Sequence, residues 1–262
     1  MLGAIAGDVI GSYHEGSGTK TKNFPLFVEQ SRFTDDTVLT IAVAEKLLRG
    51  RDYIDLFHDY FDSYPMAGYG GSFILWAGNR RRDPYSSWGN GSAMRVSPVG
   101  IICDTLEEVL AEARASAEVT HNHPEGIRGA QATAAAIFLA RTGSSKEEIK
   151  SYVQREFKYD LSAKLDAIRG DYRFDVSCQG SVPQSLIAFL EARDYEDALR
   201  NAISLGGDAD TMACIAGGVA EAYFGGIPVE VKQRTLNLLD DRLRGVIAEF
   251  YEKFGDRLTH PR

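Results

Sequence analysis

The sequence predicts an all-α protein, with residues 1–262 folded as one compact domain that carries long loops. Three observations support this class. Apolar residues recur at helical spacing through most of the chain, and strand signals are sparse, with no alternation of strands and helices. Hydrophobic residues make up 44% of the 262 residues, which is enough for a sizeable core.

The first clear helices lie in the N-terminal half. Residues 34–50 place Val38, Leu39 and Ile41 on a buried stripe, and Gly50 is a typical helix stop. Residues 104–120 form an amphipathic pattern. Residues 124–140 form another, with proline in the first turn, where its missing N–H costs no hydrogen bond.

The C-terminal half continues the pattern. Ser145 and Glu148 form a capping box, which starts a helix over residues 145–157. Further helical segments follow at residues 182–193, 195–205, 210–226 and 228–254. The best strand candidate is Tyr172–Cys178, and the glycine clusters "GYGGS" and "WGNGSAMR" fall in loops.

Charge and cysteine content restrict the possible partners. The net charge of -8 and the pI of about 5.2 argue against a general nucleic-acid-binding surface, although a nucleic-acid end remains compatible as a substrate. Cys103, Cys178 and Cys214 form no CxxC pair, which favours reduced thiols in a cytoplasmic protein. The longest nearly apolar run, residues 130–140, is too short to span a membrane. Oligomeric state is left open.

Two helix starts carry doubled acidic residues. The stretch "FTDDT" contains Asp35 and Asp36, and "GGDADT" contains Asp208 and Asp210. A single acid at a helix start is explained by capping and by the helix dipole. Two neighbouring acids repel each other, so capping alone explains these stretches poorly.

A bound hard cation would balance this charge. Mg²⁺ prefers carboxylate, hydroxyl and water oxygens, and each stretch offers two carboxylates and a threonine hydroxyl within one helical turn. Glu15, in the loop after the first apolar segment, is a further acid. Five ionised carboxylates carry about -5, which two Mg²⁺ or Mn²⁺ ions nearly cancel.

The ordered set of motifs resembles the ADP-ribosylglycohydrolase (ADP-ribosyl-acceptor hydrolase) family. The motifs are "AGDVIGSYHEG", "FTDDT", "GYGGS", "SWGNGSAMRVSPVG", "VTHNHPEGIRGAQAT" and "GGDADT", and they span nearly the whole chain. The resemblance implies an orthogonal helical bundle with a dimetal cleft. Glu15 makes the chain more similar to the serine-ADP-ribosyl hydrolase type than to the dinitrogenase-reductase-activating glycohydrolase type.

The resemblance also implies the metal ligands. Thr34, Asp35 and Asp36 would bind one ion, Asp208 and Thr211 the other, with Asp210 between them. We expect Asp35 or Asp36 to accept a proton from the attacking water and Glu15 to act as an exchangeable ligand, so these three acids are the catalytic candidates.

Glycine-rich loops suit the diphosphate of ADP-ribose, because their backbone N–H groups approach an anion closely. Trp88, with Tyr85 as a second wall, offers an aromatic face for adenine, and the resemblance places His121 near a ribose. The substrate-binding candidates are Gly70, Gly71, Ser72, Tyr85, Ser87, Trp88, Gly89, Asn90 and His121.

The expected reaction is hydrolysis at C1″ of an ADP-ribose conjugate, through a transition state similar to an oxocarbenium ion, with O-linked acceptors preferred. Three alternatives remain. One is an arginine-linked ADP-ribosyl hydrolase, and another is a non-catalytic ADP-ribose-binding module. The third is an all-α His-Asp phosphohydrolase built on His58–Asp59, which leaves both acidic helix starts unexplained.

Overall fold

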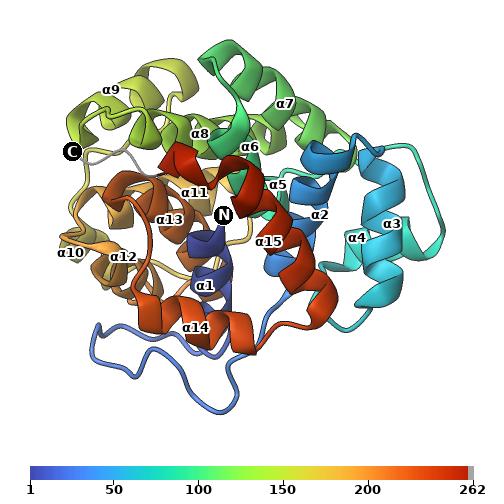
Figure 1. The fold of residues 1–262 in the computed structure, drawn as a ribbon. Helices are drawn as coiled ribbons and strands as arrows, with labels where there is room; N and C mark the ends of the chain where they lie inside the picture. Colours follow the sequence, from blue (N-terminus) through green and yellow to red (C-terminus); the bar gives the residue numbers. More distant parts are fainter. Residues whose placement is uncertain (259–262) are drawn as a thin grey trace.

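The regular structure consists of fifteen α-helices and one short 3₁₀-helix within residues 1–258, the part of the chain that the computed structural model describes. The predicted all-α class is confirmed (Figure 1). The helices are α1 Leu2–Gly11, α2 Asp35–Arg49, α3 Tyr53–Ser63, α4 Gly71–Gly78, α5 Gly91–Met94, α6 Ser97–Ile102, α7 Leu106–Glu118, α8 Pro124–Arg141, α9 Lys146–Phe157, α10 Leu165–Arg169, α11 Cys178–Leu190, α12 Tyr195–Ile203, α13 Ala209–Phe224, α14 Val229–Asn237, α15 Asp241–Phe254 and η1 Gly255–Leu258.

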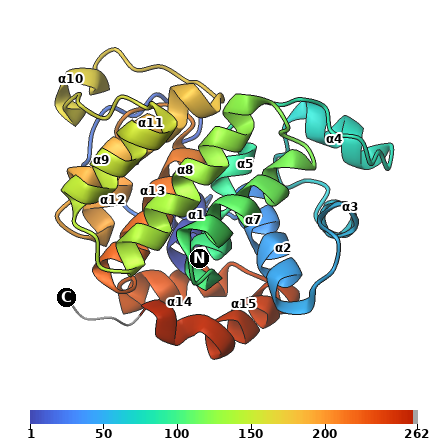
Figure 2. The same cartoon turned by 90° about the horizontal axis from the view of Figure 1, so that it is seen from above.

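Helices α1 and α13 form the centre of the core, and both views place them in the interior of the bundle (Figures 1 and 2). Glycines explain how closely they approach. A Cβ atom on Gly7 would lie 2.1 Å from the carbonyl oxygen of Ala213, and one on Gly11 would lie 2.5 Å from Cα of Asp210. Only glycine permits such backbone contact. The close packing brings the last turn of α1 against the first turn of α13, where the site lies.

Helix α2 begins as its sequence predicts. The Thr34 side chain caps it by accepting a hydrogen bond from the Asp36 N–H, and Gly50 ends it in the left-handed conformation with φ +73°. Helix α13 starts at the cap residue Asp208 and is surrounded by α1, α8, α11 and α12. The two acidic helix starts therefore lie at the same end of the central helices.

The predicted strand Tyr172–Cys178 is wrong. The segment forms one isolated antiparallel bridge, between Ser177 and Gly89. Two hydrogen bonds support it, from Asn90 N–H to the Val176 carbonyl (2.7 Å) and from Cys178 N–H to the Trp88 carbonyl (2.9 Å). No ladder develops because both partners turn at once into helices, α5 and α11.

Two helix boundaries also differ from the prediction. Helix α11 begins four residues before the expected Val182, because the Ser177 side chain caps it by accepting from Gly180 N–H. The segment 228–254 is two helices rather than one. Asp240 breaks it by accepting a hydrogen bond from Leu243 N–H, which starts α15. Across residues 1–258, no helix combines the length and the apolar character needed to cross a bilayer.

Candidate active site

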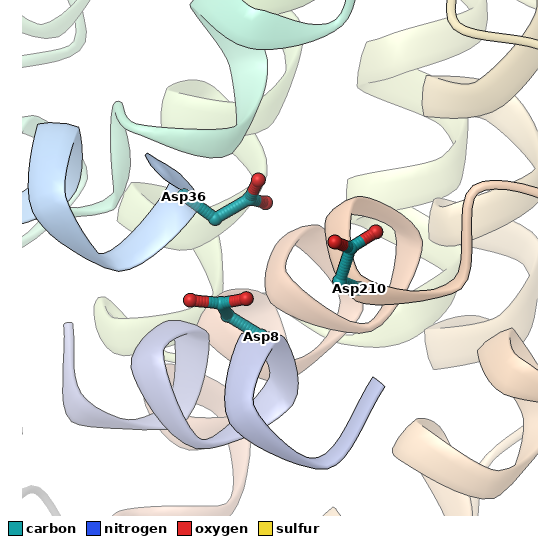
Figure 3. A group of neighbouring side chains, drawn as sticks. All are labelled: Asp8, Asp36 and Asp210. Carbon is teal, nitrogen blue, oxygen red and sulfur yellow. The ribbon is translucent and has the colours of Figure 1, made fainter. Parts of the chain in front are cut away.

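Carboxylates from α1, α2 and α13 converge at one end of the bundle. The first acidic group consists of Asp8, Asp36 and Asp210, each offering an oxygen within 4.8 Å of the others, and the three side chains point toward a shared space (Figure 3). The second acidic group consists of Glu15, Asp208 and Asp210 at the same spacing. Asp210 belongs to both groups.

Asp8 was not among the residues predicted for the site. Its carboxylate accepts four hydrogen bonds: from Thr34 N–H (2.9 Å) and Oγ1 (2.7 Å), and from Thr37 N–H (3.1 Å) and Oγ1. It thereby ties α1 to the first turn of α2. The sequence signal for Asp8 is a lone acid inside the apolar helix "LGAIAGDVIG", next to Gly7.

The aspartates of both acidic groups are buried, whereas Glu15 is exposed. Burial raises the pKa of Asp36 well above its ordinary value, and the charges of Asp8 and Asp35 raise it further. Burial also raises the pKa of Asp210, together with the charge of Asp208. Such concentrated charge is costly unless a positive partner is present.

Two further features fit a hard cation. One oxygen of Asp36, Oδ1, is fully buried without a hydrogen-bond partner, while Oδ2 accepts from the Thr211 hydroxyl at 3.1 Å. An orphaned buried carboxylate oxygen is rare in proteins and calls for an ion or a water. The donor set, carboxylates with threonine hydroxyls beside them, is the set that Mg²⁺ and Mn²⁺ prefer.

Asp35 is placed differently from Asp36. Its side chain lines the wall of the cleft and belongs to neither acidic group. Its N–H donates to the Ala67 carbonyl at 2.8 Å, which links the start of α2 to the loop before α4. Burial, with the charge of Asp8 next, raises the pKa of Asp35 to about 8.

A cleft of about 350 Å³ opens above the acidic groups. Eight of the nine predicted substrate-binding residues line it, namely Gly70, Gly71, Ser72, Tyr85, Ser87, Gly89, Asn90 and His121. Within the described chain, Trp88 is not part of this lining. Its side chain is 54% exposed and contacts His123 edge-on. Phe174, 49% exposed, is the exposed aromatic side chain that lines the cleft.

The first glycine loop prepares an anion site. Gly70 is the N-cap of α4 and provides no side-chain cap, and the start of this helix lines the cleft, where free N–H groups can bind an anion. A Cβ atom on Gly70 or Gly71 would meet nothing within 4 Å. Packing of the protein therefore does not require glycine here.

The second loop contacts the acidic groups and His121. The Asn90 side chain donates to Oδ2 of Asp208 at 2.8 Å, so it orients an acid as well as lining the cleft. A Cβ atom on Gly91 would lie 3.1 Å from Nε2 of His121. Burial, and then the charge of Arg95, lowers the pKa of His121 well below its usual value, so the imidazole is neutral at physiological pH. A neutral, buried His121 suits hydrogen bonding to a ligand.

The histidine of the alternative His-Asp site lies elsewhere. His58 is buried against Trp76, with ring centroids 4.5 Å apart, and is not part of the cleft. His58 is therefore explained by packing of α3 on α4, and Asp59 forms an ion pair with Arg51.

Comparisons with known proteins show which family the chain is similar to. The ADP-ribosylglycohydrolase family profile matches residues 1–259. Human ADP-ribosylhydrolase ARH3 is 26% identical over 305 aligned residues, covering 86% of this chain and 84% of the human protein. ADP-ribosylarginine hydrolase Tri1 of Pseudomonas putida is 32% identical, over 60% of this chain and 44% of its own length. A solved structure described as an ADP-ribosylglycohydrolase-related protein complex superposes with a TM-score of 0.67 at 26% identity and covers 96% of each chain.

Proposed function

Because the chain belongs to the ADP-ribosylglycohydrolase family, we propose that it hydrolyses the glycosidic bond at C1″ of ADP-ribose conjugates and releases ADP-ribose, preferably from O-linked acceptors. The observation that carries this proposal is the pair of acidic groups sharing Asp210 beneath a cleft lined by two glycine loops. The similarity to ADP-ribosylhydrolase ARH3 supports the same reaction.

We assign two Mg²⁺ ions, for which Mn²⁺ can substitute, to the two acidic groups. Asp36 and Asp210 would hold the first ion, with Thr34, Asp35 and Asp8 beside them. Asp208 and Asp210 would hold the second, with Glu15 and Thr211. When bound, the ions supply Lewis-acid chemistry that orients ribose hydroxyls and makes a water more acidic.

We assign the proton transfer that accompanies bond cleavage to a side chain of the cleft. Asp35 is the best placed proton acceptor, because its carboxylate lines the cleft and stands apart from both acidic groups. A water oxygen bonds to C1″, its proton passes to Asp35, and the bond from C1″ to the acceptor oxygen breaks with its electron pair on that oxygen. The acceptor leaves as an alcohol or acid after it takes up a proton.

The two glycine loops would hold the rest of ADP-ribose. The N-terminus of α4 at Gly70 and Gly71 suits the diphosphate, and Asn90 and neutral His121 suit ribose hydroxyls. Trp88 is exposed, lies between Ser87 and Gly89 of the cleft lining in the sequence, and remains our proposed face for adenine.

The acceptor linkage has one supported alternative. An ADP-ribosylarginine hydrolase is 32% identical over 60% of this chain. This similarity favours an arginine-linked substrate. Against it, four of the acids that line the cleft belong to the two acidic groups, and the fifth, Asp35, is assigned to accept the proton of the water. None is left to contact a guanidinium leaving group elsewhere.

A substrate panel tests the proposal. The protein would be incubated with Mg²⁺ and serine-linked, arginine-linked and ester-linked ADP-ribosyl conjugates, and free ADP-ribose followed by mass spectrometry. We expect release from the O-linked conjugates, and none from the Asp210→Ala variant. Tight binding of ADP-ribose without release from any conjugate would make the protein a binding module and contradict the proposal.

A further inference from the structure

Arg32 introduces a positive charge at the acidic end of the cleft. It precedes the cap residue Thr34 by two positions, and its backbone N–H donates to the Ser12 hydroxyl at 3.2 Å. The side chain is exposed and lines the cleft together with Glu15. Arg32 therefore stands beside the second acidic group, where the proposed reaction takes place.

The guanidinium of Arg32 is available to a ligand. Over residues 1–258 it forms no ion pair, and only its charge acts on Glu15. Burial and Asp208 raise the pKa of Glu15, and the positive charge of Arg32 opposes that change. Arg95, the other cation in the lining, is fully buried and donates to the Ser116 carbonyl and the Thr120 hydroxyl. Arg32 is thus the accessible cation of the cleft.

We propose that Arg32 selects the acceptor: it disfavours a cationic acceptor side chain and favours one that carries a carboxylate or phosphate next to the scissile bond. This inference rests on the proposed function, because it takes C1″ to lie at the acidic groups. The acceptor atom is bonded directly to C1″. Any charge on the acceptor close to that atom therefore comes to the end of the cleft where Arg32 stands.

Simple electrostatics gives the direction of the effect. An arginine acceptor would bring a second guanidinium toward Arg32, and juxtaposed like charges are an effective way to reject a partner. A serine oxygen adds no charge, and an acidic neighbour adds an attraction. Because Arg32 is exposed, salt screens the effect. The Debye screening length is about 30 Å at 0.01 M and about 3 Å at 1 M ionic strength, so the effect weakens as salt is added.

The diphosphate of ADP-ribose is the competing anion. If Arg32 bound the diphosphate, every substrate and the free product would depend on it equally. Affinity for free ADP-ribose, measured by calorimetry, separates the two sources, because free ADP-ribose carries the diphosphate and no acceptor.

The experiment compares kcat/KM for three ADP-ribosyl peptides: serine-linked with glutamate neighbours, serine-linked with lysine neighbours, and arginine-linked. The enzymes are wild type, Arg32→Ala, Arg32→Glu and Arg32→Lys, in Mg²⁺ at about 0.01 M and about 0.5 M added salt. Arg114→Ala is the matched control, because this exposed arginine on α7 lies outside the cleft and its loss changes the net charge equally.

We expect wild type to prefer the glutamate-flanked over the lysine-flanked serine peptide by about tenfold at low salt. Arg32→Ala should remove this preference and raise the arginine-to-serine ratio of kcat/KM by about tenfold. Arg32→Glu should shift both ratios further in the same direction. Arg32→Lys and Arg114→Ala should keep the wild-type ratios, and high salt should reduce every difference in kcat/KM between peptides.

The outcomes separate this inference from the function on which it rests. Unchanged ratios in Arg32→Ala and Arg32→Glu, with serine-linked hydrolysis intact, would overturn the selection by Arg32 and leave the proposed function standing. An equal loss of kcat/KM on all peptides, with weaker binding of free ADP-ribose, would assign Arg32 to the diphosphate. That result would also overturn the selection of the acceptor by Arg32. Failure of wild type on every conjugate would overturn both.

Discussion

Replacing Asp8 with asparagine should remove metal binding at the first acidic group while leaving the metal-free fold nearly intact. Asp8 is held by four hydrogen bonds from Thr34 and Thr37, and it lies within 4.8 Å of Asp36 and Asp210. The substitution keeps the shape of the side chain and deletes its charge. It therefore separates a structural tie between α1 and α2 from a contribution to cation binding.

The cost to the metal-free protein should be small. An asparagine oxygen can replace Oδ2 and keep three bonds, while its amide can donate to the Thr34 hydroxyl. These bonds weaken because they lose charge assistance, by about 1 kcal/mol each. The gain from not burying a carboxylate, whose pKa burial raises, offsets this. We expect the free energy of unfolding to change by at most about 1–3 kcal/mol.

The metal-dependent increment is where the variant should differ. A ligand at about a hundredfold excess over its Kd stabilises the folded state by about 2.7 kcal/mol per site. The 262 residues correspond to an unfolding entropy of about 550 cal/mol/K. Each occupied site should therefore raise the Tm by about 5 °C. Wild type should gain about 10 °C from two ions, and Asp8→Asn about half of that.

Scanning calorimetry in EDTA and in saturating Mg²⁺ measures both quantities. Asp197→Asn is the control, because Asp197 is a buried acid paired with Lys22 and Arg193 outside the cleft. It should lower the Tm in both conditions and keep the full Mg²⁺ increment. An Asp8→Asn variant that keeps the full increment would show that Asp8 only ties helices together, and it would refute this reasoning.

Three further predictions follow from packing, charge and the cleft wall. Gly7→Ala should lower the free energy of unfolding by about 3 kcal/mol or more, since its Cβ would overlap the backbone of α13. Gly245→Ala, in open space, should raise it by about 0.5–1 kcal/mol. Equal effects in urea unfolding would contradict the close packing of α1 on α13. In EDTA the Tm should rise as the pH is lowered from about 8 to about 5. Burial raises the pKa of Asp35 in the folded state to about 8, while the pKa in the unfolded chain stays near 3.8, so protons bind preferentially to the folded protein. A Tm independent of pH would show that ionisation of the buried acids does not destabilise the fold. Trp88→Ala should weaken ADP-ribose binding by about 1–3 kcal/mol in titration calorimetry. A larger loss of binding free energy for Phe174→Ala would instead assign the adenine contact to Phe174 on the cleft wall.

The acidic helix starts were predictable because their chemistry is local. A cap, a helix dipole and two neighbouring carboxylates are all visible in five consecutive residues, as in "FTDDT". Asp8 was not predictable in this way. Its role depends on packing between α1 and α2, where its partners Thr34 and Thr37 lie 26 and 29 residues away.

The misread strand and the placement of Trp88 have one cause in common. Residues 172–178 have β-propensity, but their partner is the glycine loop, which leaves for α5 after a single bridge. The same bridge brings Phe174 and Val176 to the cleft wall, while the Trp88 side chain is exposed and is not part of the cleft lining. Side-chain direction in irregular segments is set by such tertiary pairings, which the local sequence does not contain.

The central claim is that turnover needs cations held by the acidic groups around Asp210. The most direct measurement is the release of ADP-ribose from a serine-linked peptide by metal-stripped protein, with Mg²⁺ titrated back and bound metal determined by elemental analysis. The account predicts no turnover in EDTA, recovery with Mg²⁺, and no recovery in Asp210→Ala with unchanged helix content by circular dichroism. Full turnover in excess EDTA, by protein that contains no metal, would contradict it.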